Sequence, residues 1–148
     1  YKRQATAPIG LATYISEAIV RDLKDGQFTG GNRVRLRLAH VWEEVNANPG
    51  EEWNLPALAK RMHVSVRQFQ RIMKENYDVT AEGLLMRIRM EHARELLSST
   101  DMTMVMVADR IGYQCVFAFS KGFRRHFGMP PGAYRKAVNK GTIPHDVA

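Results

Sequence analysis

The chain has 148 residues, of which 45% are hydrophobic, and this composition excludes a wholly disordered protein. Its 22 lysines and arginines outnumber its 15 acidic residues, so a net charge of +7 favours polyanionic partners such as nucleic acid. The single cysteine excludes an internal disulfide, and the sequence contains neither a secretory leader nor an apolar run of about 20 residues. We therefore expect a cytoplasmic protein that does not enter a membrane.

The first predicted element is an amphipathic helix over residues 9–23, where apolar residues recur at helical spacing. Three glycines in residues 25–32 predict a linker and place a domain boundary near Gly30. Because the chain begins with Tyr1 and not with methionine, we expect residues 1–30 to be a remnant of a preceding effector or dimerisation domain. The same helix also fits an interdomain linker or a cap packed on the main domain.

A second helix is predicted from Val34 to Val45, and the Asn-Pro-Gly turn that ends at Gly50 follows it. Asn54 can then cap a short helix, LPALAKRM, which leads through a tight turn to another helix. Ser65 and Gln68 have the spacing of a capping box at the start of that helix.

The same arrangement is predicted again near the end of the chain. Thr103 can cap the short helix MVMVADRI, a turn follows at Gly112, and a further helix should run from about Cys115 to Phe127. Between the two pairs, apolar residues at helical spacing predict a connecting helix over residues 81–98, and no segment shows the alternation of a strand. The fold class is therefore all-α, with two helix-turn-helix subdomains joined by a long helix.

The two pairs form a weak internal repeat. Equivalent positions carry residues of similar character, and the second turn is one residue longer than the first. The matching pairs are Ala59 with Ala108, Ser65 with Cys115, Phe69 with Phe119, Arg71 with Lys121, and Met73 with Phe123.

The helix after Ser65 has one apolar and one cationic side. The side opposite Phe69 and Met73 carries cations and amides that suit base edges, since arginine can contact guanine bidentately and glutamine can do the same for adenine. The alternative is a solvated surface helix. The predicted DNA-contacting residues of this helix are Arg67, Gln68, Gln70, Arg71 and Lys74.

The helix after Cys115 is less polar at its start. Val116 and Phe117 cannot form hydrogen bonds with base edges, so they would contact thymine methyl groups, depend on DNA shape, or pack into the core. The predicted DNA-contacting residues of this helix are Val116, Phe117, Ser120, Lys121, Arg124 and Arg125. We expect the first helix to supply more base-specific hydrogen bonds and the second more phosphate affinity.

The remaining polar residues do not predict an enzyme or a metal site. His63, His92 and His126 lie far apart and lack metal-ligand spacing. Cys115 stands at a helix start, where a thiol can become redox-sensitive, but replacement of a serine-like cap is the simpler interpretation. No phosphate loop, nucleophile elbow or nucleotide fingerprint occurs, so we expect no catalysis and no cofactor.

Residues 34–138 resemble the DNA-binding domain of the AraC/XylS family of bacterial transcription regulators. The strongest part is VADRIGYQCVFAFSKGFRRHFGMPPGAYR, and LAKRMHVSVRQFQRIMK followed by RMEHARELL precedes it in the expected order. The resemblance implies a seven-helix, homeodomain-like tandem whose two recognition helices enter successive major grooves. We place this domain at residues 31–140 and expect residues 141–148 to be a flexible tail. By the same resemblance, the base-reading positions are Arg67, Gln70, Arg71, Val116, Phe117 and Lys121.

We therefore expect a bacterial transcription regulator, more specifically an activator, that binds double-stranded DNA in the nucleoid. RNA polymerase and a missing effector domain are its other expected partners. The alternatives are a basic helical module that binds an acidic protein, and a nonspecific nucleic-acid binder.

Overall fold

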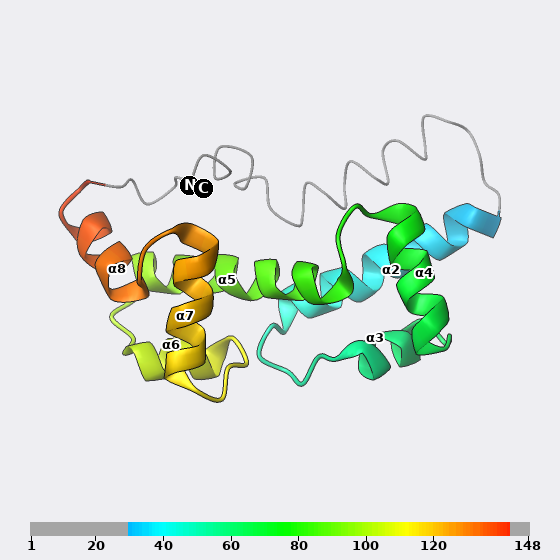
Figure 1. Ribbon diagram of the computed structural model, residues 1–148, viewed down its shortest axis with the longest axis horizontal. Helices are drawn as coiled ribbons and strands as arrows, with labels where there is room; N and C mark the ends of the chain where they lie inside the picture. Colours follow the sequence, from blue (N-terminus) through cyan, green and yellow to red (C-terminus); the bar gives the residue numbers. More distant parts are fainter. Residues whose placement is uncertain (1–29, 143–148) are drawn as a thin grey trace. The chain divides into compact units, whose positions relative to one another are not determined.

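The computed structural model describes residues 30–142, in which it has seven helices and no strand (Figure 1). This confirms the all-α prediction for the described part of the chain. The amphipathic helix predicted at residues 9–23 and most of the predicted tail lie outside it. The helices are α2 (Gly30–Ala47), α3 (Leu55–Arg61), α4 (Val66–Asn76), α5 (Ala81–Ser99), α6 (Met104–Arg110), α7 (Val116–Phe127) and α8 (Pro131–Asn139).

The described residues divide into two compact units. The N-terminal unit comprises residues 30–48 and 52–86, and the C-terminal unit comprises residues 49–51 and 87–142. Helix α5 contributes its first part to the N-terminal unit and the rest to the C-terminal unit. The long connecting helix predicted between two helix-turn-helix pairs is thus confirmed.

The core of the N-terminal unit forms where α2, α3 and α4 turn their apolar sides toward one another. Trp42 and Phe69 are fully buried, and the Trp42 indole Nε1 donates a hydrogen bond to Met73 Sδ at 3.3 Å. Each buried side chain of this size stabilises the fold by about 1.5–3 kcal/mol. The other buried apolar residues here include Leu38, Ala39, Val41, Val45, Trp53, Leu58, Ala59, Met62, Ile72, Tyr77, Ala81 and Leu84.

The core of the C-terminal unit is aromatic. Phe123 lies 5.9 Å from Phe119, 4.6 Å from Phe127 and 5.7 Å from Tyr134 between ring centroids, in edge-on or tilted pairs. Such geometries are the favoured ones, because the positive edge of one ring meets the negative face of the next. The cluster joins α7 to α8, so it holds α7 with its opposite face outward.

Arg135 of α8 ties the connection between α5 and α6 to this core. Its guanidinium donates hydrogen bonds to the carbonyl oxygens of Leu97, Met102 and Thr100, at 3.2, 2.5 and 3.2 Å. These carbonyls lie at a helix end and in a loop, where no helical partner satisfies them. The arginine therefore has a structural function in the C-terminal unit.

The start of α2 differs from the sequence prediction. Residues 30–32 form the start of α2 and not the end of a linker, because a packed helix propagates backward through glycines despite their cost of about 1 kcal/mol each. Helix α7 ends at Phe127, as predicted, and Pro131 is the first residue of α8, where its missing N–H costs nothing. No helix in the described range is long and apolar enough to span a membrane.

Candidate nucleic-acid interface

In the N-terminal unit, α3 and α4 form a helix-turn-helix whose turn depends on local contacts. The Asn54 side chain caps α3 by accepting a hydrogen bond from Ala57 N at 2.8 Å. His63 adopts the left-handed conformation with φ of 57°, and Val64 N donates to Ala59 O at 3.1 Å. Histidine tolerates this conformation better than bulkier residues do, so a tight turn forms without glycine.

The capping box predicted for α4 is present. Ser65 Oγ accepts from Gln68 N at 3.1 Å, and Gln68 Oε1 accepts from Ser65 N at 3.0 Å. Although the Gln68 side chain is exposed, its oxygen therefore already has a partner within the helix. Gln68 remains in the predicted interface through its amide nitrogen alone.

The apolar and cationic sides of α4 lie as the sequence predicts. Phe69, Ile72 and Met73 are buried, while the opposite side is exposed to solvent. Arg71 approaches Glu75 at 3.8 Å, but both side chains are about two-thirds exposed, so the pair is weak and leaves the arginine available. The exposed residues are Arg67, Gln70, Arg71 and Lys74.

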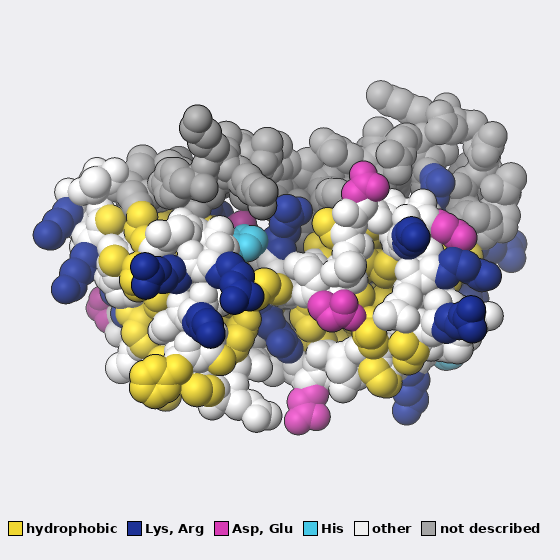
Figure 2. All heavy atoms as spheres, in the orientation of Figure 1, with side chains coloured by type: hydrophobic (Ala, Val, Ile, Leu, Met, Phe, Trp, Pro, Cys, Tyr) yellow, Lys and Arg dark blue, Asp and Glu magenta, His cyan; other side chains and the backbone are white. Residues whose placement is uncertain are grey.

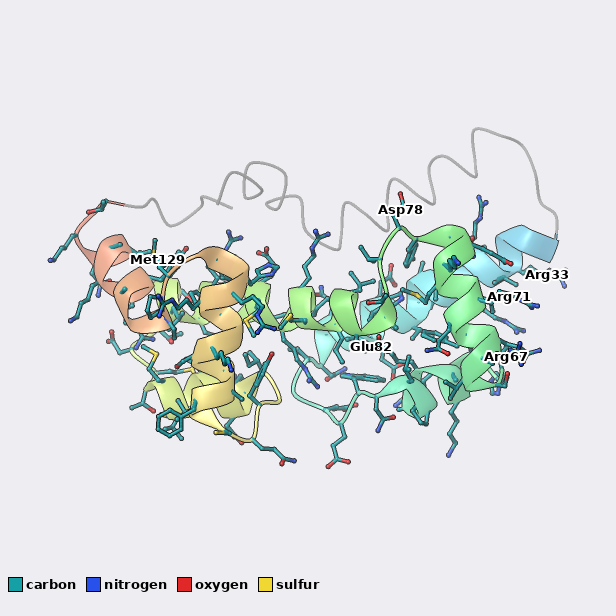
Figure 3. The ribbon with its side chains drawn as sticks, in the orientation of Figure 1. Arg33, Arg67, Arg71, Asp78, Glu82 and Met129 are labelled. Atoms are coloured by element: carbon teal, nitrogen blue, oxygen red, sulfur yellow. The ribbon has the colours of Figure 1, made fainter. Side chains whose placement is uncertain are left out.

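Helix α2 adds a cation that the sequence analysis did not include. Arg35 Nε donates to Asn76 Oδ1 at 2.9 Å, which places the start of α2 against the end of α4. Arg33 is exposed and lies at the same edge of the unit as Arg67 and Arg71 (Figure 3). The packing of the start of α2 on the end of α4 therefore adds a cation to this edge of the unit, although α2 and α4 are distant in sequence.

The charge changes beyond the C-terminal end of α4. A cavity of about 410 Å³ at this end is lined by Gln70 and Lys74 of α4 and, after the helix, by residues that include Asp78 and Glu82. Figure 3 labels the two carboxylates. These carboxylates would repel a phosphate backbone. Along the chain, the cationic side of α4 therefore gives way to acidic residues after Lys74.

In the C-terminal unit, α6 and α7 form the second helix-turn-helix. Thr103 Oγ1 caps α6 by accepting from Met106 N at 3.1 Å, and Tyr113 N donates to Ala108 O at 2.8 Å across the turn. Gly112 has φ of 91°. Cys115 is the N-cap of α7, but its side chain makes no capping hydrogen bond.

The exposed side of α7 carries one aromatic residue among cations. Lys121, Arg124 and Arg125 are exposed, whereas Val116 and Ser120 are partly buried. Phe117 is 81% exposed, so of the alternatives for this residue, packing into the core is wrong. Figure 2 shows Lys and Arg side chains gathered over α7 and, separately, over α4.

The two recognition helices match position by position at an offset of 50 residues. The N-caps Ser65 and Cys115 correspond, as do the fully buried Phe69 and Phe119. The turn before α4 spans residues 62–65 and the turn before α7 spans residues 111–115, so the extra residue predicted in the second turn is confirmed. Each unit therefore presents an equivalent helix.

The structure does not bring the histidines together as a site. His63 lies in the first turn, His92 on α5 and His126 on α7. In residues 30–142, no three histidine, cysteine or acidic side chains are grouped as metal ligands.

A family model described as "Helix-turn-helix domain" matches residues 58–137, which is more than half of the chain. The chain belongs to the AraC/XylS family. Among AraC/XylS-type structures, the DNA-binding domain of AdpA in complex with a target DNA matches with a TM-score of 0.68 and 30% identity, covering 71% of this chain and 95% of that one. A regulator with an AraC-type DNA-binding domain from Chromobacterium violaceum matches with a TM-score of 0.65 and 25% identity, over 70% and 93% of the two chains.

The curated relatives are longer proteins. The chain is 30% identical to the RCS-specific HTH-type transcriptional activator RclR of Escherichia coli, over 70% of this chain and 37% of the relative. It is also 30% identical to the HTH-type transcriptional regulator MtrA of Neisseria gonorrhoeae, over 87% of this chain and 44% of the relative. The chain thus spans less than half of the length of these relatives.

Proposed function

We propose that this chain binds double-stranded DNA sequence-specifically and regulates bacterial transcription, with α4 and α7 entering successive major grooves. The observation that carries the proposal is the pair of equivalent recognition helices, each with a buried apolar side and an exposed cationic side. B-DNA's major groove admits one helix, and successive grooves are about 34 Å apart. The AraC/XylS membership and the DNA-bound AdpA domain support the same function.

The two helices make different kinds of contact with DNA. Arg67, Gln70 and Arg71 of α4 read base edges, while Lys121, Arg124 and Arg125 of α7 bind phosphates. The exposed polar set on α4 supports this division, because arginine and glutamine form bidentate base contacts whereas phosphate contacts carry no direct sequence information.

Further roles extend this proposal to the whole protein. We infer a domain at residues 31–140, activation through RNA polymerase, a preceding effector domain and a place in the cytoplasm at the nucleoid. The printed name of one relative, an activator, supports activation. A protein lacking residues 1–29 should keep its DNA affinity, and a large loss would assign those residues to the interface or to the fold.

The test is selection of bound duplexes from a random library at about 0.15 M salt. The wild type should enrich a motif that spans two adjacent major grooves, and Arg71→Ala should lose preference at one part of it. The double variant Lys121→Ala, Arg124→Ala should instead weaken binding to all sequences and reduce the salt dependence by about two phosphate contacts. Lys136→Ala, an exposed cation on α8, is the matched control. Tight binding without enrichment would contradict sequence specificity, and no binding would contradict the proposal.

A further inference from the structure

Phe117 is the most exposed of the large hydrophobic residues in the described part of the chain. Its side chain is 81% accessible, compared with 64% for Val105 and 51% for Met106. The other three phenylalanines of α7 are at most 1% accessible and form the aromatic core. Phe117 is therefore not part of the core, although exposing an aromatic ring to water is unfavourable.

The internal repeat gives Phe117 a specific place. At the offset of 50 residues it occupies the position of Arg67, the second residue of the recognition helix. On α7 it lies in the same stripe as Lys121 and Arg124, at spacings of four and seven residues. If α7 enters the major groove, Phe117 therefore lies on the same DNA-facing side of the helix as these two cations.

The first turn of α7 has no strong hydrogen-bond donor among its side chains. Cys115, Val116, Phe117 and Ala118 begin this helix, and three of them have apolar side chains. Such a surface cannot make the bidentate contacts that distinguish guanine or adenine. It matches the one apolar group in the major groove, the 5-methyl group of thymine.

We infer that α7 specifies its part of the binding site by thymine methyl groups, which Phe117 contacts directly. This inference rests on the proposed function. The N-terminal unit selects bases by hydrogen bonds from arginine and glutamine, and the C-terminal unit selects them by an apolar contact. Thymine-containing base pairs should therefore be enriched under α7.

The experiment replaces each thymine of the selected duplex, one at a time, by deoxyuridine, which removes only the methyl group. The protein is the full chain, and the readout is equilibrium affinity by fluorescence anisotropy. At one or two positions under α7, the wild type should lose affinity about three- to five-fold, the loss that accompanies one methyl group left unburied. Phe117→Ala should bind more weakly and be insensitive to deoxyuridine at those positions, because the contact is already absent.

Two controls separate this contact from general effects. Val105→Ala removes an exposed apolar side chain from α6 and should leave the deoxyuridine response unchanged. Circular dichroism of Phe117→Ala should match the wild type, because the ring is not part of the core.

The inference and the proposed function fail in different ways. An enriched motif with no deoxyuridine effect under α7, or an equal effect in Phe117→Ala, would overturn the inference and leave sequence-specific binding intact. Unchanged DNA affinity in Phe117→Ala together with lost transcription would also overturn it and assign the ring to a protein partner. No DNA binding by the wild type would overturn both.

Discussion

The Trp42 indole nitrogen donates its hydrogen bond to the sulfur of Met73, at 3.3 Å, inside the core of the N-terminal unit. The bond joins α2 to α4, and both side chains are almost completely buried. Water therefore cannot replace Met73 as the acceptor. A buried donor that loses its partner costs about 1–3 kcal/mol, although sulfur is a weak acceptor and the lower value applies here.

Met73→Leu should therefore destabilise the protein more than Met62→Leu does, by about 1 kcal/mol. The two methionines are equally buried in the same unit, and exchange of methionine for leucine keeps the core volume nearly constant. The measurement is the free energy of unfolding in urea. In a Trp42→Phe background the difference should vanish, because no N–H group remains; equal losses in the wild-type background would contradict the role of the hydrogen bond.

The two recognition helices should respond oppositely to exchanges at their N-caps. Ser65→Ala removes the capping box of α4 and should lower the free energy of unfolding by about 1 kcal/mol. Cys115 has the extended backbone of an N-cap but no capping hydrogen bond, so Cys115→Ser should raise stability by about 0.5–1 kcal/mol. Thermal unfolding of both variants checks the prediction, and a destabilised Cys115→Ser would show that the thiol has a packing role.

Gly112 and Gly128 both have positive φ but differ in their surroundings. A Cβ at Gly112 would lie 3.0 Å from Arg89 Nη2 and 3.2 Å from Pro49 O, whereas a Cβ at Gly128 would meet nothing within 4 Å. Gly128→Ala should therefore cost only the backbone strain, about 1–2 kcal/mol.

Gly112→Ala should cost about 1–3 kcal/mol more, because it also displaces Arg89. The Arg89 side chain donates to Pro49 O at 3.1 Å and to Glu51 O at 3.0 Å, and these bonds would be disturbed. Urea unfolding of the two variants under identical conditions is the comparison. Equal losses would mean that the arginine moves aside without cost.

His126 should make the protein less stable as the pH falls. Burial lowers the pKa of His126 below its usual value near 6.5, and the charges of Arg87 and Arg94 lower it further. The unfolded chain therefore binds more protons than the folded chain between the lowered pKa and about 6.5, so the free energy of unfolding falls as the pH drops through this window. His126→Gln should flatten the profile as the pH falls below about 6.5.

Glu91 is the control, because its effect on the pH dependence of stability is opposite to that of His126. Burial raises the pKa of Glu91, and the charges of Arg94 and Arg87 only partly offset this. Its contribution to stability is present at low pH and is lost as the pH rises through the raised pKa, from about 4.5 upward. Glu91→Gln should therefore steepen the loss on acidification, and an unchanged profile in both variants would contradict these pKa shifts.

Most of the helix-turn-helix geometry could be predicted from short stretches of sequence. Asn54, Ser65 and Thr103 each accept a hydrogen bond from a backbone N–H only three residues away, so their capping role depends on neighbours in the chain. The left-handed conformation of Gly128, which ends α7, likewise depends only on neighbouring residues. The buried phenylalanines also follow from helical spacing, because one side of an amphipathic helix must be covered.

The features that could not be predicted depend on contacts between residues far apart in the chain, which form only in the tertiary structure. Two such contacts come from the packing of separate helices. Arg35 of α2 donates to Asn76 of α4, and Arg135 of α8 donates to three carbonyls at the end of α5 and in the loop after it. Phe117 illustrates the same limit. Its spacing is compatible with either a core or a surface, and only the packed aromatic cluster, which is complete without it, leaves the ring in solvent. Interactions between neighbours in the chain set which helices form and which residues cap them, so both could be predicted. Which side chains stay exposed to a partner depends on the packing of distant helices, so it could not.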